Sequence, residues 1–246
     1  MTRTKTSSLN VPIIIGSCKK YSSVFKKVYQ SIKFYLPNQT VHVISDVSFD
    51  VFQGDRSVLS KDRGWNQNLL ELLEDFDPTD YVILTMDDLL FTSSSEESFF
   101  TLTIESLIKA DYDYVSLYAP PAVKLKRAVQ TNFNLFSNIS PDHSISAMVS
   151  LIRVSLLREI LISTNSPWEF EKNSYKFLNN YRAVNLNYNL VNVSNLIVQG
   201  KKISWRNKNQ DITFIELLYS VKYFLKVLTY SSKHLLGLKF IKFLLK

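Results

Sequence analysis

Short apolar runs alternate with amphipathic stretches along the first half of the chain. The apolar runs are rich in β-branched and aromatic residues, which predicts buried strands at 11–16, 41–45, 81–85 and 114–117. The stretches between them repeat apolar residues every three or four positions, which predicts helices at 22–35, 66–73 and about 95–109. This alternation predicts an α/β fold in which helices cover both faces of a mostly parallel sheet.

The second half of the chain has a less regular pattern. Residues 133–139 and 147–152 are short and β-like, and we expect them to form antiparallel strands at the sheet edge. A helix is predicted over 154–162, and β-like alternation follows over 178–192. These elements and those before them predict one domain over about residues 1–210.

The C-terminal stretch, residues 211–246, combines apolar residues with lysines that lie beside them. Basic, aromatic-rich helices of this kind suit an anionic membrane surface. The alternative is a helix that packs on the domain and turns a solvated lysine face outward.

Composition removes several classes of site. With only 5 glycines, the sequence has neither a G-x-G-x-x-G motif nor a Walker loop. Cys18 is the single cysteine, so an intramolecular disulfide and a thiolate-rich metal site are excluded. The N-terminus does not resemble a secretory signal, and we expect a cytoplasmic protein. The net charge of +7 favours an anionic partner: nucleic acid, anionic lipid or an anionic substrate.

Two adjacent carboxylates, Asp87 and Asp88, follow the buried run YVILTM. Ligands of open α/β sheets bind beyond the carboxyl ends of the strands. Carboxylate oxygens there can hold Mg²⁺ or Mn²⁺, which bridge to substrate phosphates; otherwise one carboxylate caps the turn and the other faces water. Asp46 ends an earlier predicted strand, where it can accept hydrogen bonds from a base or ribose, or cap a turn. Arg63 is a candidate phosphate partner.

Glu169 and Glu171 lie in the segment Pro167-Trp168-Glu169-Phe170-Glu171. If the segment is extended, the two carboxylates point the same way, beside an apolar wall that favours a general base. If it is a helix N-terminus after Pro167, they complement the helix dipole instead.

The order of these features resembles the bacterial GT-A-type glycosyltransferases of capsule and O-antigen (cell-surface polysaccharide) biosynthesis. The resemblance covers roughly residues 11–205. It is carried by VPIIIGSCKKYSSVF, VISD, GWNQNLLELLEDFDPTDYVILTMDDLLF, SAMVSLIRVSLLREILISTNSPWEFE and NLIVQGKKI.

The resemblance implies a transferase that moves a sugar from a nucleotide-sugar, such as a UDP-sugar, to a lipid-linked oligosaccharide acceptor. Asp87 and Asp88 stand where such enzymes carry a D-x-D motif for a divalent cation and the diphosphate, with Asp88 the stronger candidate. Trp65 and Asn68, in the W-x-x-N-L helix entry, join the predicted donor site, and Glu169 or Glu171 falls where an acceptor-activating base of an inverting enzyme is expected.

The resemblance also implies that the C-terminal helices hold the enzyme at the inner face of the cell membrane. The competing hypothesis is a non-catalytic protein that binds anionic lipid or nucleic acid. The basic residues concentrate beyond residue 200 and form no recognisable nucleic-acid reading module, so we expect no nucleic-acid partner.

Overall fold

We analysed the fold in a computed structural model, which describes residues 11–60, 64–118, 129–130, 135–138, 145–177, 180–186, 188–198 and 201–202. The chain divides into two units, Met1–Leu196 and Ile197–Lys246. In the second unit, β12 (Ile197–Val198) pairs antiparallel with β13 (Lys201–Lys202). The predicted basic helices of 211–246 lie outside the described residues, and their membrane role stays a prediction.

The first unit is built on a sheet with the strand order β3-β2-β1-β4-β9-β6-β10-β8-β7. Its first four strands are mutually parallel, and β6 and β10 are parallel to each other, so the predicted α/β, mostly parallel architecture is confirmed. The strands are β1 (Ile13–Gly16), β2 (Val41–Ser45), β3 (Arg56–Leu59), β4 (Tyr81–Met86), β6 (Tyr114–Ser116), β7 (Val129–Gln130), β8 (Leu135–Asn138), β9 (Ser150–Arg153) and β10 (Ala183–Leu186).

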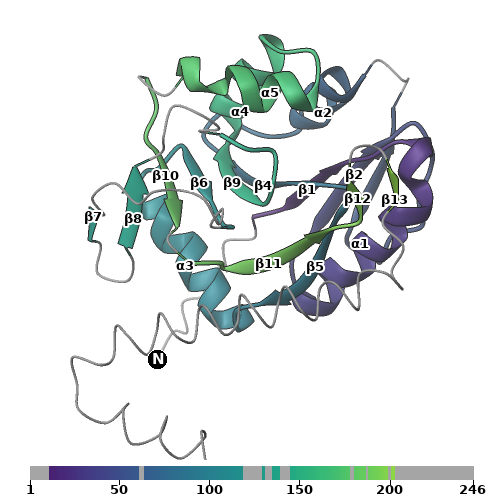
Figure 1. Ribbon diagram of the computed structural model, residues 1–246, viewed down its shortest axis with the longest axis horizontal. Helices are drawn as coiled ribbons and strands as arrows, with labels where there is room; N and C mark the ends of the chain where they lie inside the picture. The colour runs from purple at the N-terminus through teal and green to yellow at the C-terminus, as the bar shows by residue number, and fades with distance from the viewer. Residues whose placement is uncertain are drawn as a thin grey trace, which may run out of the picture. The chain divides into compact units, whose positions relative to one another are not determined.

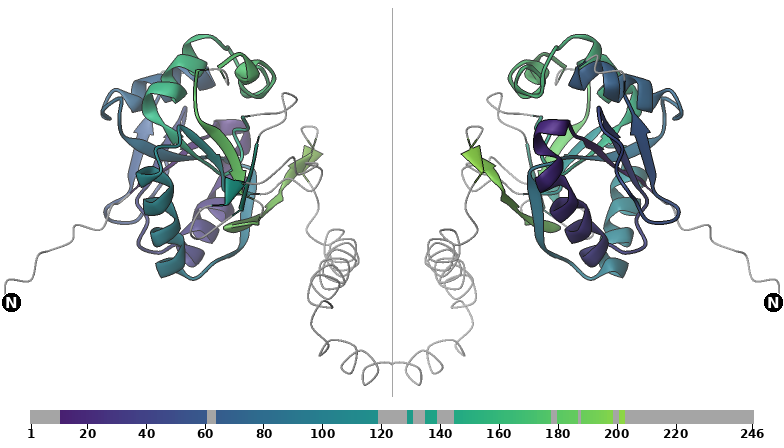
Figure 2. Two further views of the ribbon diagram at one scale, coloured as in Figure 1. Left: turned by 90° about the vertical axis from the view of Figure 1, so that its left-hand side faces the viewer. Right: turned by 90° about the vertical axis from the view of Figure 1, so that its right-hand side faces the viewer.

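Helices cover both faces of this sheet (Figures 1 and 2). On one face lie α1 (Ser22–Tyr35) and α3 (Glu97–Lys109). On the other lie α2 (Trp65–Leu73), α4 (Val154–Ile162) and α5 (Pro167–Asn173), which the short 3₁₀ helix η2 (Ser174–Phe177) continues. Alternate strand residues serve the two faces, so Ile14 of β1 joins the core beneath α2 and α4.

Strand β9 lies in the middle of the sheet, between β4 and β6, and pairs antiparallel with both. The expected antiparallel pairing of residues 147–152 is therefore confirmed, but their expected place at the sheet edge is wrong. The physical reason is burial on both faces, since Leu151 and Ile152 are both fully buried. A strand with two apolar faces belongs inside a sheet, and the apolar pattern alone does not say between which neighbours.

Strand β5 (Leu89–Ser94) was not expected, because its serine-rich end resembles a turn. It pairs antiparallel with β11 (Val191–Asn195) as a separate two-stranded sheet. The connection between β4 and β5 is the two-residue turn Asp87-Asp88. The pair of aspartates is thus held from both sides by strands.

Candidate functional site

The carboxyl ends of three neighbouring strands meet at one edge of the sheet. Gly16 at the end of β1 is level with Ile44 of β2 and with Met86 of β4. The chain leaves β1 toward β2 on one side and later enters β4 on the other side, so a topological switch point lies between β1 and β4. Open α/β sheets bind ligands in the crevice at such a point.

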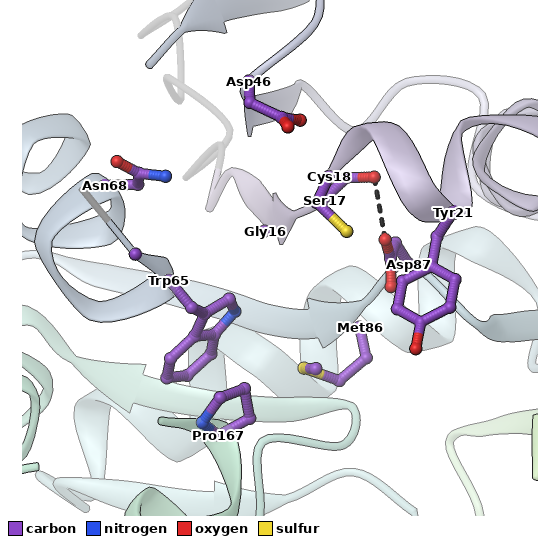
Figure 3. A pocket seen from close by; sticks show the side chains of 11 residues that line it. Gly16, Ser17, Cys18, Tyr21, Asp46, Trp65, Asn68, Met86, Asp87 and Pro167 are labelled. Carbon is purple, nitrogen blue, oxygen red and sulfur yellow. Dashed lines mark hydrogen bonds between the residues drawn. The ribbon is translucent and has the colours of Figure 1, made fainter. Parts of the chain in front are cut away.

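A cavity of about 200 Å³ lies at this edge (Figure 3). Trp65 and Asn68 from the start of α2 stand on one side of it, and Asp87 and Tyr21 stand on the other. The remaining lining residues come from the loop after β1, from the ends of β2 and β4, and from the entries of α2 and α5: Gly16, Ser17, Cys18, Asp46, Gly64, Met86 and Pro167. Four of the predicted donor residues, Asp46, Trp65, Asn68 and Asp87, therefore share one cavity.

Asp87 is a buried carboxylate in the wall of this cavity, with only 4% of its surface exposed. Ser17 Oγ donates a hydrogen bond to its Oδ2 at 2.8 Å, which fastens the loop after β1 to the turn after β4. Burial raises the pKa of Asp87 to about 7; the bond from Ser17 lowers it and the neighbouring Asp88 raises it further. Among the described residues no lysine or arginine forms an ion pair with it. The site thus contains a buried acid without a compensating charge.

Asp88 occupies the second position of the same turn but does not line the cavity. Its backbone carbonyl accepts a hydrogen bond from Leu196 N at 2.7 Å, which anchors the end of β11. Burial raises the pKa of its carboxyl group as well. The sequence favours Asp88 as the principal cation ligand, whereas the geometry gives the cavity position to Asp87.

Trp65 and Asn68 place polar atoms in the cavity wall that have no hydrogen-bond partner among the described residues. Trp65 Nε1 is a buried donor and Asn68 Oδ1 a buried acceptor, and neither is bonded. Native structures leave few buried polar groups unpaired, and each such group calls for an explanation. A ligand that carries both an acceptor and a donor would supply the missing partners.

Gly16 has no side chain, and this allows the indole of Trp65 to reach the cavity wall. A Cβ atom on Gly16 would lie 2.5 Å from Trp65 Nε1, which is closer than nonbonded atoms approach. The indole also packs edge-on against the buried ring of Phe170, with the ring centroids 5.7 Å apart. The strand end of β1, the entry of α2 and helix α5 therefore fix one another around the cavity.

Asp46 follows β2 and lines the cavity from the other side of β1. Its Oδ1 accepts a hydrogen bond from the backbone N–H of Lys19 at 2.5 Å and from Ser45 Oγ at 3.3 Å. The turn-capping and ligand-binding interpretations of this residue are compatible, because Oδ2 has no hydrogen bond to a described residue. Arg63, the predicted phosphate partner, lies outside the described residues.

Glu169 and Glu171 belong to helix α5, so the segment is not extended. The N-cap Ser166 accepts a hydrogen bond from Glu169 N, and Glu169 Oε2 accepts one from Asn165 N at 2.9 Å. This reciprocal arrangement is a variant of a capping box. Trp168 is 80% exposed and forms no apolar wall beside the carboxylates.

Glu171 points back into the domain. Its Oε1 accepts hydrogen bonds from Ser146 Oγ at 2.5 Å and from Ala147 N at 3.2 Å, which tie α5 to the segment before β9. Neither Glu169 nor Glu171 lines the cavity. The base role of either residue stays a prediction.

The aspartates fit a hard divalent cation only together with ligand oxygens. Within the described parts of the chain, no three His, Cys, Asp or Glu residues are grouped as a metal site. Mg²⁺ is commonly held by one or two carboxylates plus substrate phosphates rather than by an all-protein cage. Asp87, buried and without a cationic partner among the described residues, is a carboxylate of the kind that such a shared site needs.

Several cavity residues escape sequence analysis. Gly16 and Ser17 could have been found from their position after a predicted strand. Tyr21, Met86 and Pro167 carry no signal, because contacts between distant segments bring them to the cavity. No described helix is long and apolar enough to span a membrane.

No protein-family model matches the sequence, and no curated protein sequence matches it. Among solved structures, it is similar to the mannosyltransferase PcManGT from Pyrobaculum calidifontis in complex with GDP-Man and Mn²⁺, with 14% identity over 79% of this chain and 59% of that chain and a TM-score of 0.46. It is also similar to a putative glucose-1-phosphate thymidylyltransferase from Bacillus anthracis, with 14% identity over 81% of this chain and 94% of that one and a TM-score of 0.47. The bifunctional IspDF from Campylobacter jejuni matches at 12% identity over 63% and 44%, with a TM-score of 0.37. This chain thus spans less than two thirds of two of these proteins.

Proposed function

We propose that this protein is a glycosyltransferase that binds a nucleotide-sugar in the cavity between β1, β4 and α2. The observation that carries the proposal is the buried Asp87 carboxylate, which has no ion-pair partner among the described residues and faces the unpaired polar atoms of Trp65 and Asn68 across the cavity. A nucleotide-sugar supplies both the missing hydrogen-bond partners and the missing positive charge. Its base and ribose offer donors and acceptors, and its diphosphate brings a divalent cation.

The donor would lie with its nucleoside toward Asp46, Trp65 and Asn68 and its diphosphate toward the Asp87-Asp88 turn. Mn²⁺ or Mg²⁺, held by Asp87 with Asp88 as a further candidate, would neutralise the leaving diphosphate. Asp87 also accepts the hydrogen bond from Ser17, so the same carboxylate orders the loop after β1 that lines the cavity.

The transfer step that we propose is an inverting displacement. An acceptor hydroxyl oxygen attacks the anomeric carbon, the bond from that carbon to the diphosphate oxygen breaks, and the nucleoside diphosphate leaves. The hydroxyl proton passes to a carboxylate base, for which Glu169 and Glu171 are the candidates from sequence. The acceptor would be a lipid-linked oligosaccharide of surface polysaccharide synthesis, met at the inner face of the cell membrane.

The test is a thermal-shift screen of the full chain against a panel of nucleotide-sugars, with and without Mn²⁺. A ligand at 100 times its Kd stabilises a folded protein by about 2.7 kcal/mol, so the correct donor raises the melting temperature measurably. The positive compound is then incubated with the protein, and release of the nucleoside diphosphate is measured.

Asn68→Ala is the matched variant for the nucleoside side of the cavity, and it should weaken donor binding without unfolding the protein. A shift from no nucleotide-sugar under either condition would overturn the proposal. Such a result, combined with binding to nucleic acid or anionic lipid, would favour the non-catalytic alternative.

A further inference from the structure

Helix α5 and the following η2 present a distinctive outer surface. Of residues 167–177, the four exposed ones are Trp168, Lys172, Tyr175 and Lys176. We call this set the α5–η2 face. Trp168 is 80% exposed and Tyr175 48%, which makes them two of the eight large hydrophobic side chains exposed among the described residues.

All four residues are exposed on the surface of this segment. Trp168 and Lys172 are four positions apart in α5 and so lie on the same side of that helix, and Tyr175 and Lys176 follow in η2. Figure 1 shows α5 at the outside of the layer that covers this face of the sheet. The face is therefore exposed on the outside of this layer.

The acidic residues of α5 do not neutralise the α5–η2 face. Glu169 is only partly exposed and caps the helix start, and Glu171 is hydrogen-bonded to Ser146 and Ala147. No ion pair with a described residue involves Lys172 or Lys176. The α5–η2 face thus carries two lysines without an ion-pair partner among the described residues and two aromatic rings, in the order Trp168, Lys172, Tyr175 and Lys176.

Aromatic rings with a polar edge and lysines with a flexible apolar stem are the side chains that settle at a membrane–water boundary. Lysines near an anionic leaflet each contribute about fivefold to partitioning. A glycan site would instead need carboxylate or amide side chains for the sugar hydroxyls, and the face exposes none.

We propose that the α5–η2 face docks on an anionic phospholipid surface, with Trp168 and Tyr175 at headgroup level and the two lysines against lipid phosphates. Pro167, the first residue of α5, lines the cavity, so docking would bring the cavity wall close to the membrane. This inference extends the proposed function. It rests on that function in one respect: a lipid-linked acceptor would explain why the enzyme binds a membrane.

The test is co-sedimentation of the full chain with vesicles of phosphatidylcholine alone or with about 30% phosphatidylglycerol. No nucleotide-sugar is present, so the result is independent of donor binding. We expect binding to the anionic vesicles only, and partitioning at least about tenfold weaker for Lys172→Glu/Lys176→Glu. Trp168→Ala should weaken partitioning severalfold at unchanged charge.

Helix α1 offers matched controls of the same residue types. Lys26 and Lys27 are exposed lysines, and Phe34 is 76% exposed. Lys26→Glu/Lys27→Glu and Phe34→Ala should each weaken partitioning less than the corresponding change on the α5–η2 face. Equal losses on both helices would overturn the proposal, because the binding would then reflect the net charge of +7 alone.

Fluorescence reports insertion directly. The chain has three tryptophans, Trp65, Trp168 and Trp205. In a Trp205→Phe background, brominated lipids should quench emission, and Trp168→Phe should remove the quenching. The proposal would be overturned if brominated lipids do not quench the emission. It would also be overturned if Trp168→Phe weakens binding of a soluble oligosaccharide and leaves vesicle binding unchanged. Thermal shift with the donor shows separately whether the proposed function stands.

Discussion

Two pairs of carboxylates in this protein look alike in sequence and differ in what surrounds them. Glu169 and Glu171 have their charges satisfied by the fold, through backbone and side-chain donors of neighbouring segments. Asp87 is more deeply buried at a cavity, where burial raises its pKa to about 7, and it has no ion-pair partner among the described residues. A carboxylate that accepts hydrogen bonds from the protein stabilises the structure. A carboxylate that is buried without a counter-charge lowers stability, and such a group is expected where a ligand binds and supplies the missing interaction.

The strongest test of this difference is Asp87→Asn. The substitution keeps an acceptor for Ser17 but removes the charge, so we expect at least about a hundredfold loss of nucleotide-sugar-dependent turnover, as for other groups that stabilise transition-state charge. Thermal shift with the donor and Mn²⁺ and release of the nucleoside diphosphate are the measurements.

Asp88→Asn is the control, since its side chain does not line the cavity. Asp88→Asn should lose less nucleotide-sugar-dependent turnover than Asp87→Asn. If Asp88→Asn abolishes donor binding and Asp87→Asn leaves it intact, the preference drawn from the sequence is right and the geometric assignment is wrong.

The pH dependence of stability sharpens the comparison. The pKa of Asp87 rises from 3.8 to about 7 on folding, so between these values the folded state holds a proton that the unfolded state releases. Stability contributed by this group therefore falls as the pH rises from about 4 to about 7 and does not recover above it. The upper limit of the effect, from 3.8 to about 7, is about 4 kcal/mol.

Urea unfolding in EDTA at pH 5 and pH 8 measures this effect. Relative to the wild type, Asp87→Asn should be clearly more stable at pH 8, and the gain should be much smaller at pH 5. A gain that is equal at both pH values would mean that Asp87 does not titrate abnormally.

Local patterns in the sequence were sufficient for the elements that bury one regular face. The predicted boundaries of helices α1 and α4 agree with the structure, because apolar residues recur with helical spacing in both. Strand β3 escaped prediction because its four residues are exposed or half-buried and give no core pattern. Strand β5 escaped because its serine-rich end resembles a turn and its partner β11 lies about a hundred residues away.

The candidate site was also predictable from the sequence only in part. Its location follows from carboxylates at predicted strand ends, as with Asp46 and Asp87. The sequence cannot reveal that Ser17 and Asp87, 70 positions apart, form a hydrogen bond, or that the Gly16 backbone makes room for Trp65. It also left two conformations open for the Glu169 segment, which the capping bonds of α5 resolve as helix.

The packing of the cavity wall can be tested at Gly16. In Gly16→Ala the new methyl group would meet Trp65 Nε1 at 2.5 Å, so the indole must move. Overpacking of this kind costs about 1–3 kcal/mol, and the displaced indole should weaken donor binding as well. Chemical denaturation and the donor thermal shift measure the two effects.

Gly54→Ala is the control, because it has φ +93° but no neighbour within 4 Å of the new Cβ. It should lose about 1–2 kcal/mol from backbone strain and leave donor binding unchanged. A second variant, Gly16→Ala with Trp65→Phe, should recover part of the lost stability. Strict additivity of the two changes would mean that the side chains do not clash.

The smallest effects are expected at the satisfied carboxylates. Glutamine at position 169 or 171 keeps an acceptor oxygen but loses the charge that strengthens each hydrogen bond and complements the start of α5. We expect each single variant to lose about 0.5–1 kcal/mol of stability and to bind the donor like the wild type. Urea unfolding and thermal shift test this pair of expectations.

Transfer to an acceptor then separates structure from catalysis. Removal of a general base lowers turnover by about 10²–10⁴, far more than so small a loss of stability explains. If one variant stops transfer and the other does not, that residue is the base and must leave its present hydrogen bonds when the acceptor binds. If both transfer equally well, the protein satisfies these carboxylates for structure alone, and the base must be sought among groups whose charge the fold leaves free.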